Sequence, residues 1–185
     1  MFEPLAIPGL VLVRPKRHED SRGSFIETFS QAAFAEAGLP HFMQDNESLS
    51  RKRGTVRGLH FQTDPFAQAK LIRCTQGSMF DVAIDIRRGS PTFGRHVALT
   101  MSADDPALMF VPVGFAHGFC TLEPDTVVQY KVSAPYAPTN DHGIAWDDPA
   151  LGIDWPVSPA EAVLSDRDRR HPSFADLPAV FAWAG

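Results

Sequence analysis

Hydrophobic and polar residues alternate with a period of two along much of the chain. In the segment MFDVAIDIR at 79–87, large apolar side chains occupy the even positions from Phe80 to Ile86, whereas Asp81 and Asp85 fall on the other face. Because successive side chains of a β-strand point to opposite faces of a sheet, this pattern predicts a strand with one more polar face.

Further short segments have the same character, and glycine- and proline-containing turns such as RRGSPTFG at 87–94 separate them. We predict strands at 10–14, 25–29, 57–62, 70–74, 96–100, 108–111, 118–122 and 127–132. Many short strands joined by turns are typical of an antiparallel sandwich or barrel. We therefore expect an all-β fold in a single domain that spans residues 1–185.

Only one stretch convincingly predicts a helix. The segment QAAFAEA at 31–37 follows Ser30, a favourable N-cap, and precedes Gly38, which is typical of a helix end. From Pro172 onward the chain contains proline, alanine and tryptophan without a regular period. No element is predicted in that C-terminal segment.

The charge balance narrows the classes of partner. The chain has 17 Lys and Arg residues against 22 Asp and Glu residues, a formal net charge of -5. An acidic protein offers no general attraction to nucleic acid or to an anionic membrane, so neither is expected as a partner. Two cysteines without CxxC spacing suit a reducing compartment, and we expect a cytoplasmic protein.

The densest cluster of candidate chemistry is VRGLHFQ at 56–62. If this segment is a strand, His60 shares the more polar face with Gly58 and Gln62 and is a candidate general base. The alternative is a core histidine whose nitrogens are satisfied by neighbours. A second histidine, His117, lies in the turn-containing segment VPVGFAHGF, where a turn with an aromatic plug is the simpler interpretation.

These two histidine segments, 57 residues apart, suggest the two-motif pattern of the cupin barrel, in which HxH and a later PxGxxH supply metal ligands. Here the first motif reads His60, Phe61, Gln62, and no glutamate follows at a convincing ligand position. The usual ligand set cannot be assembled. We predict no catalytic metal, which argues against the alternative of a metal-dependent cupin oxygenase.

A histidine base that works without a metal needs an acceptor on its other ring nitrogen. Asp168 in LSDRD is the candidate, although a mixed-charge segment of this kind is also typical of a solvated loop. Tyr130 in VVQYKV is a candidate proton donor or an ordinary sheet tyrosine. Four cations near these groups could form a local anion site: Arg22, Arg57, Lys70 and Arg73.

Long motifs make the chain recognisable over residues 5–170. They are DSRGSFIETF, QDNESLSRKRGTVRGLHFQ, AKLIRC, GSMFDVAIDIRRGSPTFG, VPVGFAHGF, QYKVSAPYAP, GIAWDDPALGIDWP and LSDRD. In order and spacing the sequence resembles the dTDP-4-dehydrorhamnose 3,5-epimerases. This resemblance implies a cupin-type jelly-roll barrel with a few short helices.

The resemblance also implies a reaction and a set of roles. The family inverts C3 and C5 of a dTDP-linked 4-keto-6-deoxyhexose, by proton transfer alpha to the C4 ketone, without a cofactor. In this chain His60 resembles the base, Asp168 its orienting carboxylate, Tyr130 the acid and Lys70 the cation beside the C4 oxygen. His117 resembles a pocket-lining residue, and Arg22 and Arg57 resemble diphosphate ligands. Positions that resemble the nucleoside contacts are Phe25, Glu27, Gln44, Asn46 and Tyr136.

The resemblance implies a homodimer in which residues 22–27 reach across the interface, with the early strand at 25–29 as the swapped element. Two alternatives stay open within and beside the family. One is a single-centre epimerase, which shares the fold and much of the site. The other is a catalytically silent nucleotide-sugar binding protein, whose signature would be loss of His60, Tyr130 or Asp168, and all three are present.

Overall fold

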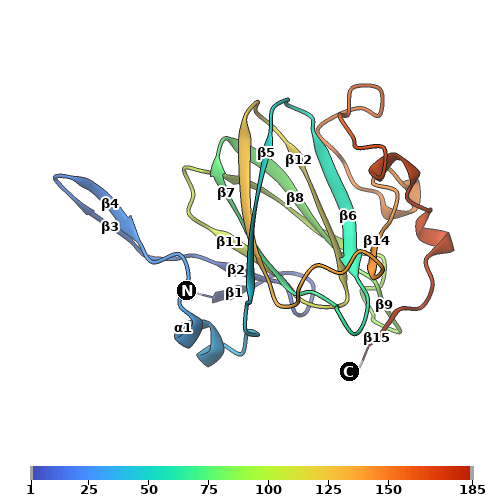
Figure 1. Ribbon diagram of the computed structural model, residues 1–185, viewed down its shortest axis with the longest axis horizontal. Coiled ribbons are helices and arrows are strands. Elements are labelled where there is room, and N and C mark those ends of the chain that lie inside the picture. Colours follow the sequence, from blue (N-terminus) through green and yellow to red (C-terminus); the bar gives the residue numbers. More distant parts are fainter. Residues whose placement is uncertain (1, 184–185) are drawn as a thin grey trace.

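Two antiparallel sheets form the body of the protein (Figure 1). This computed structural model describes residues 2–183. The larger sheet has the order β1 (Phe2–Pro4), β2 (Val11–Val13), β11 (Leu108–Val111), β7 (Lys70–Gln76), β13 (Thr126–Val132), β5 (Gln44–Ser50). The smaller sheet has the order β10 (His96–Ser102), β8 (Ser78–Asp85), β12 (Phe115–Thr121), β6 (Val56–Gln62), β14 (Asp141–Gly143). The expected all-β fold is confirmed.

The two-residue period of β8 explains how the layers pack. Met79 and Ala83 belong to the cluster of buried residues that also contains Ile72 of β7 and Val128 of β13, so this face looks toward the other sheet. Alternate positions such as Val82 belong to a second cluster, which includes C-terminal residues. The more polar face predicted for 79–87 is therefore the interior face.

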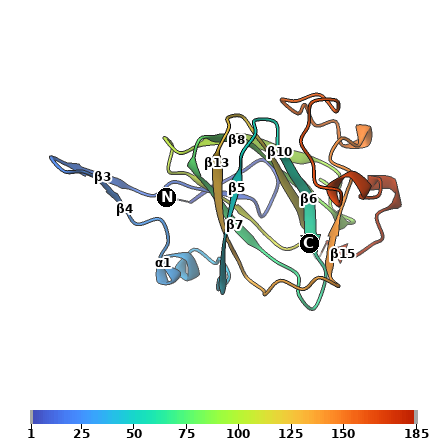
Figure 2. The same cartoon turned by 45° about the horizontal axis from the view of Figure 1, so that its top comes forward.

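A hairpin of β3 (Arg17–Asp20) and β4 (Gly23–Ile26) extends away from the body, as both ribbon views show (Figures 1 and 2). The prediction of a strand at 25–29 is wrong in its bounds, because β4 begins earlier and ends at Ile26 opposite Arg17. Pro15 lies two residues before Arg17 and has no backbone N–H. It therefore cannot donate a hydrogen bond that would extend the pairing of β3 and β4.

The predicted helix is confirmed as α1 (Gln31–Glu36), although the Ser30 side chain makes no capping hydrogen bond. Short 3-10 helices follow late in the chain: η1 (Pro149–Leu151), η2 (Asp168–Arg170) and η3 (Phe174–Asp176). β15 (Phe181–Ala182) pairs in parallel with β9 (Arg87–Arg88). Among residues 2–183, no helix is long and apolar enough to cross a membrane.

Several elements were not predicted from the sequence, and those of the C-terminal segment and β5 are the most informative. The C-terminal segment has no regular period, yet Leu177 is buried there and Phe174 and Phe181 pack on the outer face of the smaller sheet. It was missed because short irregular elements packed by single side chains carry no periodic signal. β5 was missed because its sequence, QDNESLS, is polar on both faces. That composition is unusual for a strand and indicates an interior face that is not filled by core side chains.

Candidate active site

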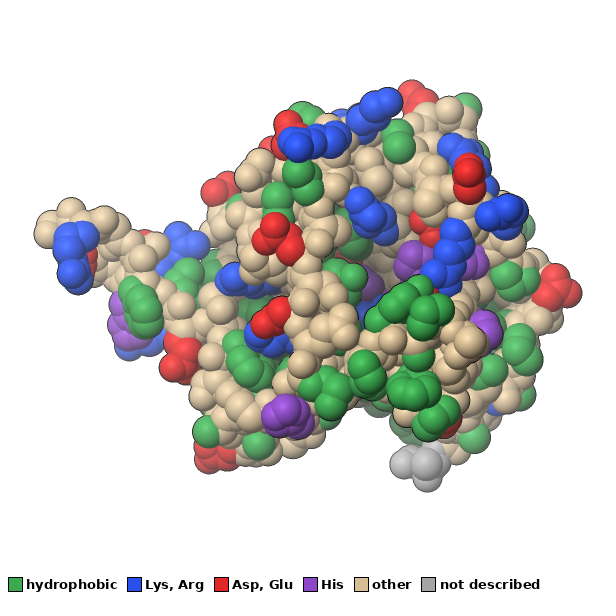
Figure 3. Space-filling view, in the orientation of Figure 1, with side chains coloured by type: hydrophobic (Ala, Val, Ile, Leu, Met, Phe, Trp, Pro, Cys, Tyr) green, Lys and Arg blue, Asp and Glu red, His purple; other side chains and the backbone are tan. Residues whose placement is uncertain are grey.

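A cavity of about 290 Å³ lies between the two sheets. Its lining residues are Ser48, Arg57, His60, Lys70, His117, Phe119, Tyr130, Ser165, Arg167 and Asp168. Both sheets and the segment that leads into η2 contribute to this wall. In the space-filling view, histidine side chains lie in a hollow with Lys and Arg side chains around it (Figure 3). Six residues singled out in the sequence therefore meet in one cavity.

His60 and Asp168 form the closest pair in this cavity. The imidazole Nε2 lies 2.5 Å from Asp168 Oδ1, and the His60 side chain is 31% exposed while that of Asp168 is 5% exposed. A carboxylate accepts a hydrogen bond, so the neutral imidazole carries its proton on Nε2 and keeps a lone pair on Nδ1. Asp168 is thus not part of a solvated loop.

Ser165 fixes the second oxygen of this carboxylate. Its hydroxyl donates to Asp168 Oδ2 at 2.9 Å, and the Asp168 backbone N–H donates back to Ser165 Oγ at 3.1 Å. Burial raises the pKa of the Asp168 carboxyl, but the neighbouring side chains of His171, His60 and Ser165 outweigh this effect and hold that pKa below its ordinary value. Asp168 therefore stays ionised throughout the neutral range.

Burial lowers the pKa of the His60 imidazole, whereas it raises the pKa of a carboxyl group. Desolvation lowers the pKa of His60 from its ordinary value of 6.5, and the nearby charge of Lys70 acts in the same direction, whereas Asp168 opposes both. The net result is an imidazole that is neutral near pH 7. A neutral, oriented imidazole that reaches a cavity has the properties that a general base needs.

His117 forms a second histidine–aspartate pair. Its Nε2 lies 2.7 Å from Asp81 Oδ1, and the two side chains are 9% and 0% exposed. Both residues come from the smaller sheet, where His117 of β12 is the register partner of His60 on β6. Asp81 was missed in the sequence as a site residue, although the period of β8 already placed it on the interior face.

Lys70 brings a positive charge into the cavity from the larger sheet. It lies on β7, and its Nζ donates to the backbone oxygen of His60 at 3.4 Å. Burial lowers the pKa of the Lys70 ammonium to about 8, although the carboxylates of Asp141 and Asp81 oppose that shift. The side chain is therefore mostly cationic at pH 7 and loses its charge above about pH 8.

Tyr130 lies on β13, also in the larger sheet, so it approaches the cavity from a different wall than His60 on β6. Burial raises the pKa of its phenol above the ordinary value of 10. The hydroxyl is protonated at neutral pH. A base and a proton donor thus stand on walls formed by two different sheets.

Gln62 has a structural role in place of a metal ligand. Its amide nitrogen donates to the backbone oxygens of Phe66 and Pro135 at 2.7 and 3.1 Å, and its oxygen accepts from the N–H of Ala137. A different trio could hold a metal ion, because ligand atoms of His60, Asp168 and His171 all lie within 4.8 Å of one another. Sequence reasoning did not single out His171.

The residues expected at the nucleotide are divided between two places. On β5, Gln44 Nε2 donates to Asn46 Oδ1 at 2.8 Å, and Gln44 Oε1 accepts from the backbone N–H of Tyr136 at 3.3 Å, so these three cluster. Arg22, Phe25 and Glu27 do not join them. Arg22 and Phe25 lie on the projecting hairpin, where Phe25 is 70% exposed, and Glu27 is exposed just beyond it.

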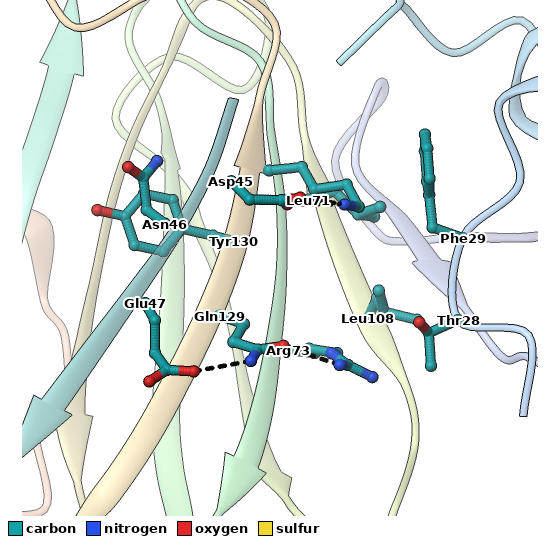
Figure 4. Close-up of a pocket in the computed structure, with 11 residues that line it drawn as sticks. Thr28, Phe29, Asp45, Asn46, Glu47, Leu71, Arg73, Leu108, Gln129 and Tyr130 are labelled. Carbon is teal, nitrogen blue, oxygen red and sulfur yellow. Dashed lines mark hydrogen bonds and ion pairs between the residues drawn. The ribbon is translucent and has the colours of Figure 1, made fainter. Parts of the chain in front are cut away.

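A second and larger cavity, of about 470 Å³, lies on the outer face of the larger sheet (Figure 4). Arg73 lines it and donates to Gln129 Oε1 at 2.8 Å, while Gln129 in turn donates to Glu47. The prediction that Arg73 joins Lys70 in the anion site is wrong, because an offset of three residues in a strand puts the two side chains on opposite faces. The polar side chains of the outer cavity are hydrogen-bonded to one another, and none of these described side chains is positioned as a general base.

The sequence missed four residues that line the inner cavity, namely Ser48, Phe119, Ser165 and Arg167. Ser48 follows Gln44 and Asn46 at the two-residue period of β5, so that period was the available signal. Arg167 donates to the carboxylate and the backbone oxygen of Asp141, at 2.5 and 2.9 Å. That contact joins β14 to the segment before η2, which is distant in sequence, and could not be derived from the chain.

Comparisons with known proteins agree with this geometry. A family model described as dTDP-4-dehydrorhamnose 3,5-epimerase matches residues 4–176. A curated dTDP-4-dehydrorhamnose 3,5-epimerase from Sinorhizobium fredii is 51% identical over 186 residues, which cover 98% of this chain and 93% of that protein.

Solved structures match the fold over almost the whole chain. A dTDP-6-deoxy-D-glucose-3,5-epimerase from Legionella pneumophila, in complex with dTDP-4-keto-L-rhamnose, matches with a TM-score of 0.94 at 35% identity and covers 100% of this chain and 99% of that one. A double mutant of ChmJ, a 3'-monoepimerase from Streptomyces bikiniensis in complex with dTDP, matches with a TM-score of 0.87 at 36% identity, over 94% and 87% of the two chains. The expected cupin-type barrel is confirmed.

Proposed function

The chain belongs to the dTDP-4-dehydrorhamnose 3,5-epimerase family, and we propose that it inverts both C3 and C5 of dTDP-4-dehydro-6-deoxy-D-glucose to give dTDP-4-dehydro-L-rhamnose. The chain is an isomerase that acts on a dTDP-linked sugar. We assign the whole of residues 1–185 to one cupin-type domain. The two buried, unpaired cysteines, Cys74 and Cys120, are in accord with a cytoplasmic setting.

One observation carries the mechanism: a neutral histidine, held by a buried carboxylate, faces a cavity that also contains a cation and a phenol. A proton alpha to a ketone becomes acidic only when the charge that develops on the carbonyl oxygen is stabilised. The minimum set is a base at the carbon and a fixed positive charge at the oxygen. In this proposal His60 Nδ1 removes the proton, and Asp168 stabilises the imidazolium that forms.

Lys70 supplies the fixed positive charge. Its ammonium is buried, so its interaction with an enolate oxygen is stronger than it would be in water. A positioned donor of this kind contributes about 3 kcal/mol to transition-state stabilisation. In the proposed reaction the C4 oxygen of the sugar lies beside Nζ, within reach of the base on β6.

Inversion requires that a second proton arrives on the opposite face of the sugar ring. Tyr130 can fulfil this requirement because β13 belongs to the other sheet, so the ring would lie between the phenol and the imidazole. The raised pKa of the phenol keeps the proton available at neutral pH. The ChmJ double mutant carries one His→Asn and one Tyr→Phe substitution, the same two residue types as in this acid–base pair.

We place the nucleotide at the open side of the cavity. Arg57 lines the cavity and is exposed, which suits a contact with the diphosphate. Gln44 and Asn46 of β5 form a cluster with Tyr136, which lies in the loop after β13. His117 lines the cavity deeper inside and contacts the sugar.

Residues Arg22, Phe25 and Glu27 complete the site only in a homodimer. The hairpin that carries the first two has every residue from 17 to 25 exposed, and it projects from the body rather than folding over its own cavity (Figures 1 and 2). Phe25, which pairs with His18 on this projecting hairpin, exposes 70% of its surface and is available for contact with a second subunit. We propose that it reaches the nucleotide end of the cavity in the partner subunit.

The two-centre reaction is favoured over a single-centre one by similarity. The family model that matches residues 4–176 is that of the dTDP-4-dehydrorhamnose 3,5-epimerases, and the Sinorhizobium fredii 3,5-epimerase is 51% identical to this chain. Exchange in D₂O tests the assignment. Incubation with dTDP-4-keto-6-deoxyglucose should place deuterium at C3 and C5, as followed by NMR, and should give an L-configured product.

The matched control is Tyr130→Phe. Without the phenol, a proton can return only from the His60 side, so we expect deuterium exchange with retention of configuration. Label at a single carbon in the unaltered protein would replace the proposal with a single-centre epimerase. Binding without any label would indicate a silent nucleotide-sugar binding protein.

A further inference from the structure

His171 is a buried histidine beside the proposed base that the mechanism does not use. It directly follows η2, its side chain is 8% exposed, and its Nε2 lies 3.4 Å from Asp168 Oδ1. Among the described residues this nitrogen has no hydrogen-bond partner, although it is fully buried. Burial of an unpaired polar atom costs about 1–3 kcal/mol, so such an atom points to a missing partner.

The place of this ring is built into the fold. A Cβ atom at Gly143 would lie 2.4 Å from the His171 ring, so only glycine at that position leaves room for the imidazole. Gly143 of β14 is the register partner of His60 on β6, and the two imidazoles meet edge to face with their centroids 5.3 Å apart. The same strand pair therefore positions both rings around Asp168.

Three metal-ligand atoms converge at this point. The ligand nitrogens of His60 and His171 and the carboxylate of Asp168 lie within 4.8 Å of one another, beside the inner cavity. Two imidazoles and a carboxylate with one open position form a frequent zinc site, with ligand distances of about 2.0–2.2 Å. Small side-chain shifts would bring the donors to those distances, and water in the cavity would fill the open position.

We propose that His60, Asp168 and His171 form a binding site for Zn²⁺ or a similar divalent transition-metal ion, and that the bound ion inhibits the epimerase. The inhibition, though not the binding, rests on the proposed function. The ion would not be a cofactor of the reaction, because it occupies the groups that the reaction needs free.

The inhibition follows from the tautomer of His60. In the metal-free protein the imidazole proton is on Nε2, facing Asp168, and the reactive lone pair is on Nδ1. When Nε2 coordinates the ion, its proton moves through solvent to Nδ1, and the ring stays neutral. Nδ1 then carries a hydrogen and accepts no proton from the sugar.

Charges around the site favour selective rather than general cation binding. Lys70 and Arg167 both line the cavity, and their positive charges oppose any cation, while Arg167 is itself paired with Asp141. Hard cations such as Mg²⁺ prefer several oxygen ligands and keep their water, so a site with one carboxylate and two imidazoles disfavours them. Nitrogen ligands favour Zn²⁺ and Co²⁺.

Cobalt provides a spectroscopic readout that is independent of activity. Titration of the full-length protein with Co²⁺ should produce intense visible absorption of a tetrahedral complex at one equivalent, and Zn²⁺ should remove it. Zn²⁺ should abolish epimerisation over the same concentration range, whereas Mg²⁺ should have no effect. His171→Asn should weaken Co²⁺ binding by about 100-fold or more, and His142→Asn, at an exposed histidine of β14, should leave it unchanged.

The two proposals can fail separately. Cobalt absorption that depends on His171, in a protein that does not epimerise, would support the metal site and overturn the proposed function. Epimerisation that Zn²⁺ does not inhibit, without cobalt absorption, would overturn the metal site alone. If the His171→Asn variant does not fold, the imidazole ¹⁵N chemical shifts of the unaltered protein, measured by NMR with and without Zn²⁺, test the metal site instead. Zn²⁺ should move the resonances of His60 and His171, and shifts confined to other histidines would contradict the proposal.

Discussion

Two histidines on neighbouring strands, His60 and His117, line the same cavity, and each is paired with an aspartate; the pairs differ in where the carboxylate comes from. Asp81 lies on the same sheet as His117, and both side chains are almost fully buried. Asp168 comes instead from η2, outside the sheets, and its partner His60 is 31% exposed. His117 and Asp81 are both fixed within one sheet and buried, so His117 forms a fixed part of the cavity wall. His60 is oriented by a carboxylate outside the sheets and is still exposed enough to contact a ligand.

The supports of the two carboxylates differ as well. Both oxygens of Asp168 have partners, His60 on one and Ser165 on the other. Asp81 Oδ2 is buried and has no hydrogen-bond partner among the described residues. A fully satisfied carboxylate is better suited to stabilise an imidazolium, because it need not reorganise when the charge appears.

The largest expected effect separates the two histidines directly. His60→Asn should reduce kcat by roughly 10²–10⁴-fold, since it removes the general base. His117→Asn should keep kcat within about tenfold, which corresponds to 1.4 kcal/mol, and should act mainly through KM. Steady-state kinetics of the two variants measures both. Equal losses of kcat in the two variants would contradict the claim that His60, and not His117, is the general base.

Substitution of the two aspartates should affect different properties: Asp168 activity and Asp81 stability. Asp168→Asn should lower kcat on the order of 10²-fold or more, because an amide can donate to His60 Nε2 and so favour the wrong tautomer. Asp81→Asn should instead lower the free energy of unfolding by about 1–3 kcal/mol and leave most activity. Chemical denaturation and kcat, measured on both variants, form the check. A stable but inactive Asp81→Asn variant would contradict this division.

The pH profile should sharpen the comparison, because His60 must be neutral and Lys70 must be charged. The pKa of His60 is lowered from 6.5, so activity should fall on the acid side below pH 6.5. The pKa of Lys70 is lowered to about 8, so activity should also fall as the pH rises through about 8. A Lys70→Arg variant, if active at all, should lose the basic limb, since a guanidinium stays protonated. An unchanged basic limb would assign it to another group.

The smallest expected effect is that of Ser165, which hydrogen-bonds the carboxylate that orients His60. Ser165→Ala removes the hydrogen bond from its hydroxyl to the Asp168 carboxylate and the acceptor of the Asp168 backbone N–H, each worth about 1 kcal/mol, while the contact with His60 stays, so kcat should fall by only a few fold. The acid limb should change little, because Asp168 retains its contact with His60. Ser48→Ala, which also lines the cavity but does not contact Asp168, is the matched control.

The sequence predicted those parts of the molecule that follow from periodicity. The alternation in 79–87 put Asp81 on the more polar face of its strand, and the pattern of VRGLHFQ put His60 on the more polar face of another; the structure shows that the face with Asp81 is an interior face. Periodicity could not find β5, whose polar interior residues line a cavity instead of a core. It also could not place Arg167 or His171, whose positions depend on contacts between segments distant in sequence.

The residue pattern made Asp168, Tyr130 and Lys70 candidates beside open alternatives, and the resemblance to a family assigned each of them one role. The structure brings these side chains into one cavity with His60. The hairpin residues Arg22 and Phe25 remain apart from that cavity within one chain. No pattern within a single chain encodes a contact with a second copy, so their role stays a prediction that depends on dimerisation.

Chemical rescue tests the central claim that His60 is the base and His117 is not. His60→Gly leaves a gap in which added free imidazole can act as the base, so imidazole should restore deuterium exchange at C3 and C5 in proportion to its concentration. His117→Gly should show exchange that imidazole does not change. Rescue of His117→Gly alone would reverse the assignment of the two pairs and contradict the account.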